Sequence, residues 1–321
     1  MALDQPEETP VVGQRGGALA VGAGALAQQA SEAASRRSAG PWLQVLQRTF
    51  RAKSAVVGLM LLTFIIVIEL FGYRLAPYNT THINLTEGAV YHSPPSLSHP
   101  FGTDDLGRDI LSRLLVGGRI SIAIGFAATI ISVIVGVIIG ATSGMARGFV
   151  DSVLMMVTNW FLSFPFFLLA LAIIAVYGSG VNSVVAALWI SGWAYFARLL
   201  RGQVLSIRET EYVEAARASG AGGLRVLHKH ILPNSMAPLM VVATLSIAGN
   251  ITGEAGLSFL GVGVPPTQAI TWGNMAGIGE QFVTFNPVEV LAPSAAIAIT
   301  LIAVTLFGNA LRDAADPKLK D

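Results

Sequence analysis

The sequence predicts an all-α polytopic membrane protein with six transmembrane helices. Of its 321 residues, 53% are hydrophobic and only 12% are charged, whereas soluble domains carry about 25% charged residues. Six segments also hold the roughly 20 mostly apolar residues that a helix needs to cross a bilayer. The basic residues are unevenly divided among the segments that connect these spans, and this division predicts the orientation.

Residues 1–40 precede the first span and differ from the rest of the chain. They are rich in Ala, Gly, Ser and Gln and contain no aromatic residue. Such a segment buries too little apolar surface to fold alone, so we expect a disordered cytoplasmic tail. A signal peptide is not favoured, because Asp4, Glu7 and Glu8 stand where a basic region is expected.

The six predicted spans follow in order along the chain: 54–73, 120–141, 152–177, 178–197, 235–253 and 290–309. The first span contains Glu69 near its far end, where we expect the side chain to snorkel to the interface. The third contains Pro165, which predicts a kink. The Gly-Ser-Gly sequence at 178–180 predicts a tight hairpin between the third and fourth spans.

Small and amide side chains within the spans predict helix packing. Asn159 and Asn250 are expected to form hydrogen bonds between helices. Four glycines recur at roughly helical spacing in and after the second span, which predicts close approach of another helix; they are Gly125, Gly136, Gly140 and Gly144.

The orientation follows from the positive-inside rule. With the N-terminus in the cytoplasm, 16 Lys and Arg residues lie on the cytoplasmic side and four on the other side. We therefore predict a multi-pass protein of the bacterial cell membrane with both termini in the cytoplasm. Three connecting regions are longer than simple turns: 74–119 and 254–289 outside, and 198–234 inside.

The cytoplasmic region reads as two short helices with a glycine corner. Thr210 is a candidate N-cap, and Gly220 stands where a left-handed residue would end the first helix. A second helix is expected at 224–231, ended by Pro233, with Asn234 or Ser235 capping the fifth span. From these features alone, the hairpin suits a partner protein and a lipid surface about equally.

The spacing of residues in this region then favours a partner protein over a lipid surface. Glu214, Ala215 and Ala216 are followed after three residues by Gly220, and later by the Leu-Pro pair at 232–233. This pattern resembles the EAA loop of permease subunits of bacterial ABC importers, in which the loop forms the coupling helix that fits a groove on the ATPase. The resemblance implies coupling roles for nine residues: Tyr212, Glu214, Ala215, Ala216, Gly220, Ala221, His230, Leu232 and Pro233.

Other residues narrow the resemblance to one branch. The broad family has Ile where this chain has His230, and the Lys-His-Ile-Leu-Pro order at 229–233 looks like the peptide importers. The segments 99–119 and 254–275 are similar to the second (C-type) permease of dipeptide and oligopeptide importers of the nickel/peptide family. This implies an outer gate or binding-protein contact formed by Asp104, Asp105, Arg108, Asp109, Arg113, Glu254 and Phe259. Without the resemblance, the charges at 105–113 favour a solvated entry to the second span, with Asp105, Arg108, Asp109 and Arg113 in i,i+3 and i,i+4 pairs.

The resemblance implies the type I ABC importer permease architecture. It divides the chain into a tail (1–40), a first helix with its outer segment (41–119), a permease domain (120–311) with a coupling loop at 198–235, and a second tail (312–321). This chain would form half of a pore for di- or oligopeptides. Its implied partners are a sister permease, two ATPases that bind ATP and Mg, and an extracytoplasmic solute-binding protein.

No enzyme motif accompanies these features. The sequence lacks G-x-x-x-x-G-K-[ST], H-E-x-x-H and G-x-S-x-G, and it has no cysteine. His82, His92 and His99 share one outer region without close ligand spacing or an evident carboxylate pattern, so no metal site is predicted. A net charge of +1 gives no case for nucleic-acid binding.

Three alternative functions differ in what they require of the sequence. Nickel or another small solute could be the cargo of the same permease architecture. An ion-coupled secondary transporter would place acids near the bilayer midplane, and spans two to six carry none there. An intramembrane enzyme would need a nucleophile and a base at depth, and the spans offer no such pair.

Overall fold

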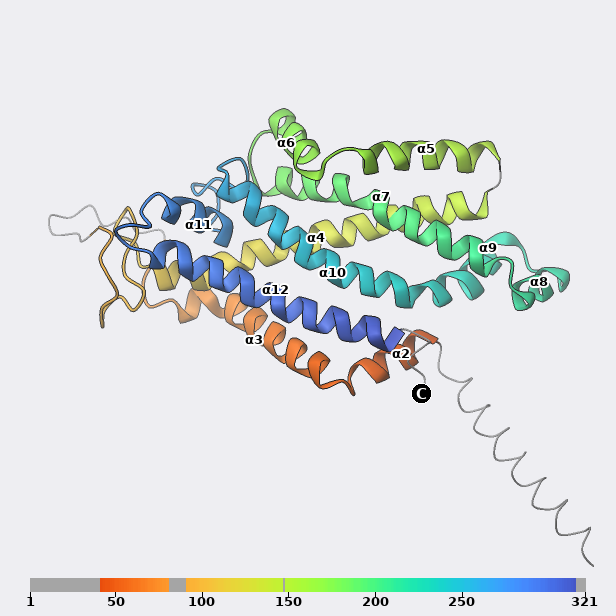
Figure 1. Cartoon of the computed structure of the whole chain (residues 1–321), viewed down its shortest axis with the longest axis horizontal. Helices are drawn as coiled ribbons and strands as arrows, with labels where there is room; N and C mark the ends of the chain where they lie inside the picture. The colour runs from red at the N-terminus through yellow and green to blue at the C-terminus, as the bar shows by residue number, and fades with distance from the viewer. Residues whose placement is uncertain (1–40, 81–90, 147, 316–321) are drawn as a thin grey trace, which may run out of the picture.

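Figure 1 shows the computed structural model as a bundle of long helices that run along one axis. The structure describes residues 41–80, 91–146 and 148–315, so the predicted tail at 1–40 lies outside the described residues. Of the predicted second tail, 312–315 continue the last helix and 316–321 lie outside the described residues. Within these ranges, five helical stretches are long and apolar enough to cross a membrane: α3 (Lys53–Leu75), α4 (Ile110–Met145), α7 (Val181–Ile207), the stretch Gly223–Phe259 that ends in α10 (Leu232–Phe259), and α12 (Val288–Ala315). The bent pair α5 (Phe149–Ser163) and α6 (Phe166–Tyr177) is apolar enough to make a sixth span if its two helices are counted together. The predicted all-α fold is confirmed.

The longest helix, α4, begins at Ile110, ten residues before the predicted start of the second span. Asp109 caps it by accepting a hydrogen bond from the backbone N–H of Ser112. Arg113 and Arg119 lie in its first three turns and lower the local hydropathy, so the start was predicted too late. The domain division at 119/120 therefore falls within one continuous helix.

Glycines let α4 and α7 pack closely, as predicted. A Cβ atom at Gly136 would lie 2.4 Å from Cβ of Phe196, and one at Gly140 would lie 2.5 Å from the carbonyl oxygen of Ala197. A Cβ atom at Gly144 would meet Val204 at 2.6 Å. Adding even a methyl group at these positions would force the two helices apart.

The predicted interhelical amide bonds are also present. Asn250 of α10 donates to the hydroxyl of Thr129 on α4 at 2.9 Å. Asn159 of α5 accepts from the Arg198 guanidinium of α7 at 2.7 Å. Both asparagines therefore tie neighbouring helices together.

The third span is broken rather than kinked. α5 and α6 meet at 95° across Phe164 and Pro165. Phe164 has an extended backbone, as a residue before proline prefers. Beyond the break, α6 packs on the first turns of α7, and Gly178 and Gly180 form the expected tight turn between them with positive φ angles.

The second short helix of the 198–234 region does not end at Pro233, contrary to the prediction. α9 (Gly223–Val226) continues through a π-helical turn, η1 (Leu227–Ile231), directly into α10. Pro233 stands in the first turn of α10. Asn234 and Ser235 do not cap that helix; their side chains donate to carbonyl oxygens one turn earlier, those of His230 and Ile231.

Two short helices were not predicted. α2 (Pro41–Thr49) lies against α10 and α12, and α11 (Trp272–Glu280) packs on α10 and α12 at the opposite end of the molecule.

The predicted snorkelling of Glu69 is wrong. Only 5% of this residue is exposed, and its carboxyl group packs against Gly118 of α4.

Candidate functional site

The α8 hairpin, formed by α8 (Glu211–Ala218), α9 and η1, projects from one end of the bundle (Figure 1). Thr210 occupies the N-cap position of α8 with an extended backbone. Its carbonyl oxygen accepts hydrogen bonds from the N–H groups of Val213 and Glu214. Its hydroxyl, however, donates to the carbonyl oxygen of Ile207 at 2.7 Å, so the predicted side-chain cap is wrong.

Gly220 ends α8 as predicted. Its φ of +87° lies in the left-handed region. The N–H of Gly220 donates to the carbonyl of Arg217 at 2.9 Å, and that of Ala221 donates to the carbonyl of Ala216 at 3.0 Å. These two bonds make a Schellman motif, which satisfies the last carbonyls of the helix and fixes the direction in which the chain leaves it.

The hairpin is anchored to the bundle by an apolar cluster. Val213, Val226 and Ile231 of the hairpin are fully buried, and they pack with Leu200 and Val204 of α7. The same cluster includes partly buried residues of α4 and α10. Burial of three β-branched side chains makes the hairpin a firm extension of α7 and α10 rather than a loose loop.

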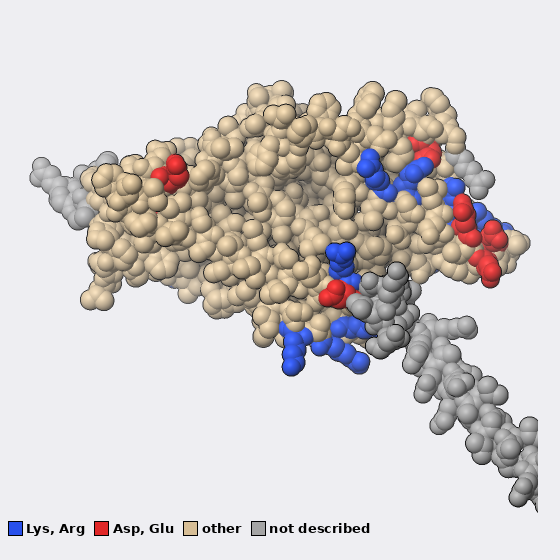
Figure 2. All heavy atoms as spheres, in the orientation of Figure 1, with Lys and Arg blue, Asp and Glu red and all other residues tan. Residues whose placement is uncertain are grey.

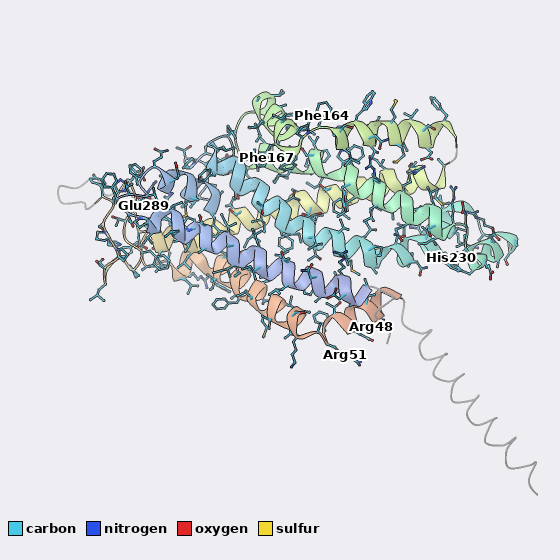
Figure 3. The ribbon with its side chains drawn as sticks, viewed as in Figure 1. Arg48, Arg51, Phe164, Phe167, His230 and Glu289 are labelled. Atoms are coloured by element: carbon cyan, nitrogen blue, oxygen red, sulfur yellow. The ribbon has the colours of Figure 1, made fainter. Side chains whose placement is uncertain are left out.

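The outer face of the hairpin is polar and exposed. Tyr212 is 46% exposed, and Glu214, Ala215 and Gly220 are exposed as well. Figure 2 shows acidic atoms gathered at this tip with basic atoms beside them. The remaining predicted residues are half-buried behind this face: Ala216, Ala221, His230, Leu232 and Pro233. The ring of His230, labelled in Figure 3, lies 6.1 Å from that of Tyr212.

An ion pair at the base of the hairpin was missed by sequence reasoning. Arg201 of α7 donates two hydrogen bonds to the Asp151 carboxylate of α5, at 2.7 and 2.8 Å. The hydroxyl of Ser143 on α4 also donates to Asp151. Arg208 donates to the carbonyl of Gly144 at 2.8 Å. These contacts join the ends of α4, α5 and α7, and only their common position at neighbouring span ends could have indicated them.

At the far end, the predicted charged segment forms one cluster before α4. Asp104 accepts from Arg108 Nε at 2.8 Å and lies 3.3 Å from Arg113 Nε. Arg108 also pairs with Asp105 at 3.2 Å. The predicted pair of Asp105 with Arg108 is confirmed, whereas the pair of Arg108 with Asp104 was not predicted. Arg113 pairs with Asp104, and Asp109 instead caps α4. Beside this cluster lies a cavity of about 470 Å³, lined by Thr80, Asp105, Leu106, Arg108, Arg113, Pro266, Thr267, Ile270 and Ile278.

Two histidines have acidic partners that sequence reasoning did not find. His99 Nδ1 lies 2.9 Å from Asp109, and His92 Nδ1 lies 2.7 Å from Glu289 at the start of α12. Figure 3 labels Glu289 at this end of the bundle. The partner of His92 is almost 200 positions away in sequence, so no local pattern signals it. Within the described residues, no group of three or more His, Asp or Glu side chains is arranged to hold a metal ion.

Glu254 and Phe259 lie apart from the charged cluster. Glu254 is fully buried and accepts a hydrogen bond from Ser258 at 2.8 Å. Ser258 in turn accepts from the N–H of Val264, so the pair orders the turn after α10. Phe259 is exposed at the end of that helix. Glu254 reaches no surface in this conformation, and its gating role stays a prediction.

The α5–α6 break presents an exposed apolar face. Every residue from 163 to 168 is exposed, and Phe164 and Phe167, labelled in Figure 3, are 61% and 43% exposed. The 15 residues of α5 place the break roughly 22 Å from the start of the helix, within the roughly 30 Å thickness of the hydrocarbon core. Broken backbone at such a depth in a bilayer is tolerated only where protein covers it or water reaches it.

Comparisons with known families agree along most of the chain. Residues 132–321 match the family described as binding-protein-dependent transport system inner membrane component. Residues 40–95 match the N-terminal TM domain of oligopeptide transport permease C.

Individual relatives cover nearly the whole sequence. The oligopeptide transport system permease protein OppC of Bacillus subtilis is 39% identical over 290 residues, which are 90% of this chain and 94% of that protein. The glutathione transport system permease protein GsiD of Shigella flexneri is 40% identical over 285 residues, covering 87% and 91%. A solved chain of the MetNI methionine ABC transporter in an inward-facing conformation shares the fold, with a TM-score of 0.52, 19% identity, and coverage of 64% of this chain and 96% of that chain.

Proposed function

Since the chain belongs to the family of binding-protein-dependent transport system inner membrane components, and is an oligopeptide-type permease subunit of an ABC importer, we propose that its cargo is di- or oligopeptides. The relatives named for oligopeptide, putative peptide and glutathione transport support this cargo, since glutathione is itself a small peptide. The permease is an integral, multi-pass membrane subunit and not an enzyme; ATP hydrolysis belongs to separate partner subunits.

The α8 hairpin is proposed as the surface that docks an ATPase subunit. Its position at one end of the bundle, its exposed polar face and its buried anchor support this role. Tyr212, Glu214 and Ala215 would contact the ATPase directly. The half-buried His230 and Pro233 would shape the support behind them. Docking on a rigid hairpin lets a movement of the ATPase reach the membrane helices.

The proposed assembly contains a sister permease, two ATPases and an extracytoplasmic binding protein. The exposed α5–α6 face would line the pathway opposite the sister permease, because its broken backbone needs water or protein. The far-end cluster of Asp104, Arg108 and Arg113 and its neighbouring cavity would meet the binding protein. Both termini and the hairpin would lie in the cytoplasm, which the positive-inside rule supports.

Coupling can be tested by charge reversal on the hairpin. The chain would be purified with its sister permease and ATPases and reconstituted in vesicles. Glu214→Arg is expected to reduce both ATPase retention and ATP-driven uptake at least several-fold. Glu280→Arg makes the same change at an exposed position at the opposite end of the molecule, and it should leave ATPase retention unchanged. If Glu214→Arg preserves both retention and uptake, the docking proposal fails.

Cargo needs a separate measurement. Vesicles with the complete importer and its binding protein would be given radiolabelled di-, tri- and hexapeptides, and separately nickel. ATP-dependent peptide accumulation that requires this chain supports the proposal. Nickel accumulation without peptide uptake would replace peptide by the alternative cargo while leaving the permease assignment intact.

A further inference from the structure

Three exposed cations, which form the basic patch, stand where α2 meets α3. Arg48 lies in the last turn of α2, Arg51 lies in the connecting turn, and Lys53 is the first residue of α3. None of the three forms an ion pair with a described residue. Arg312 and Asp313, at the nearby end of α12, are also exposed, and their opposite charges offset each other. Figure 2 shows basic atoms gathered on this part of the surface, and Figure 3 labels Arg48 and Arg51 there.

The backbone that carries the basic patch is fixed to the bundle. α2 packs against α10 and α12. Thr49 is fully buried, and its hydroxyl donates to the carbonyl oxygen of Val45 at 2.9 Å. At the start of α3, a Cβ atom at Gly58 would lie 2.8 Å from the carbonyl oxygen of Ala303 in α12. The three cations therefore project from packed helix ends and their short connection rather than from a loose loop.

An exposed apolar stripe on α3 begins directly beside the basic patch. Counted from Lys53 in steps of three or four residues, which keep to one face of a helix, the next side chains are apolar and exposed: Val56, Met60, Phe64, Val67 and Phe71. Phe64 lies roughly 16 Å from Lys53 along the axis, about half the thickness of the hydrocarbon core. Because α3 is long and apolar enough to cross a membrane, Lys53 stands at its water boundary and the stripe runs into the bilayer.

We propose that the basic patch binds the headgroup of an anionic phospholipid, such as phosphatidylglycerol. The guanidinium groups of Arg48 and Arg51 and the ammonium of Lys53 would donate to phosphate oxygens, and one acyl chain would lie along the stripe. Phe50, which is half exposed between the two arginines, would sit at the boundary of headgroup and acyl chain.

The combination of charge and apolar surface selects this class of ligand. A soluble acidic molecule matches the cations and leaves the stripe without a partner. A zwitterionic phospholipid matches the stripe and brings a cation of its own to the basic patch. A lipid with net negative charge meets both requirements, and basic residues at a membrane surface attract such lipids.

Lipid retention by the intact importer tests the proposal. The complex of this chain with its sister permease and ATPases would be reconstituted with equal amounts of phosphatidylglycerol, phosphatidylethanolamine and phosphatidylcholine. After mild delipidation, the retained lipids would be measured by native mass spectrometry, and the wild type should retain phosphatidylglycerol preferentially. Arg48→Gln with Arg51→Gln should weaken the most tightly retained phosphatidylglycerol about 25-fold, because each basic residue near an anionic headgroup contributes roughly fivefold.

Two matched double variants separate this patch from charge in general and from folding. Arg74→Gln with Arg119→Gln removes two exposed cations where α3 ends and α4 begins, away from the basic patch, and should leave retention unchanged. Arg48→Lys with Arg51→Lys keeps both charges and should preserve most of the retention. Equal retention by the wild type and the Arg48→Gln, Arg51→Gln variant would overturn the proposal, as would an equal loss in the Arg74→Gln, Arg119→Gln control.

A soluble anion and a subunit contact are the alternative occupants. Displacement of the retained lipid by inorganic phosphate would assign the basic patch to a soluble anion. The chain has no native cysteine, so Arg51→Cys and Met60→Cys can be tested for cross-linking without background from this chain. Efficient cross-linking of either variant to the sister permease or an ATPase would refute the lipid site. The expected result is no such cross-link, together with labelling of Met60→Cys by a lipid-soluble maleimide.

Discussion

Gly220 offers a test in which conformation and contact can be separated. Its φ of +87° is unfavourable for a residue with a Cβ atom, by about 1–2 kcal/mol. No atom lies within 4 Å of the position where that Cβ would stand. The cost of a substitution within this chain is therefore backbone strain alone, without a steric contribution.

The expected order of effects follows from this geometry. Gly220→Asn should be nearly neutral, because Asn tolerates the left-handed region. Gly220→Ala should cost about 1 kcal/mol and reduce the population of the formed helix end about fivefold. Gly220→Val should cost more, about 2 kcal/mol, because a β-branched side chain is a genuine outlier at positive φ.

The assay is ATP-driven uptake by the reconstituted importer, together with the amount of ATPase that co-purifies with each variant. Uptake should fall in the order glycine, asparagine, alanine, valine, with retention of the ATPase falling in parallel. A valine variant with full uptake would refute the need for the left-handed corner. An asparagine variant as defective as valine would show that side-chain size at the docked surface matters instead of backbone conformation.

Three further predictions follow from named contacts. Asp151→Asn should weaken the bidentate bond with Arg201 and lower the stability by about 1–2 kcal/mol, since the pair is only partly buried. The uptake per ATP hydrolysed should fall more than the retention of the ATPase. An unchanged ratio of uptake to ATP hydrolysis would contradict the link from α7 to α5. Gly136→Leu should prevent α4 and α7 from packing and abolish assembly of the permease, measured by gel filtration. The control is Gly202→Ala on α7, where nothing lies near the added Cβ. This control should preserve assembly and raise the melting temperature slightly. Asp109→Ala should remove the two bonds to Ser112, at 2.7 and 2.6 Å, and lower the stability by about 1–2 kcal/mol, seen as earlier thermal unfolding; an unchanged transition would show that the α4 cap contributes little.

Periodic and local signals in the sequence were sufficient for much of the fold. Hydropathy located the five long spans and the bent α5–α6 pair, and the glycine spacing correctly indicated close helix packing on α4. The left-handed Gly220 was also predictable, because a helix that ends at such a glycine is a local event. The start of α4 was not predictable, because Arg113 and Arg119 lower the hydropathy of its first turns to that of a solvent-exposed segment.

Features that depend on distant partners could not be predicted. Glu69 looked like a residue able to snorkel, but whether it does so depends on α4 packing over it, and α4 begins 41 positions later at Ile110. Glu289 finds His92 across the whole chain. The break at Pro165 was expected only as a kink, because the size of the bend is set by the packing of α6 on α7 rather than by proline itself.

The contacts around α7 explain how a movement of the α8 hairpin could be transmitted to the exposed α5–α6 face, which lies toward the other end of the bundle. At its base, α7 is tied to the start of α5 by Arg201 and Asp151. Near its beginning, α7 packs against α6 through Leu188 and Ile174. α5 and α6 are therefore both joined to α7, and α5 continues into α6 along the chain. None of these three helices can move independently without breaking the ion pair or opening the apolar contact. Because the buried Val213 fixes the hairpin to this same helix, a displacement of α8 would carry the exposed α5–α6 face with it.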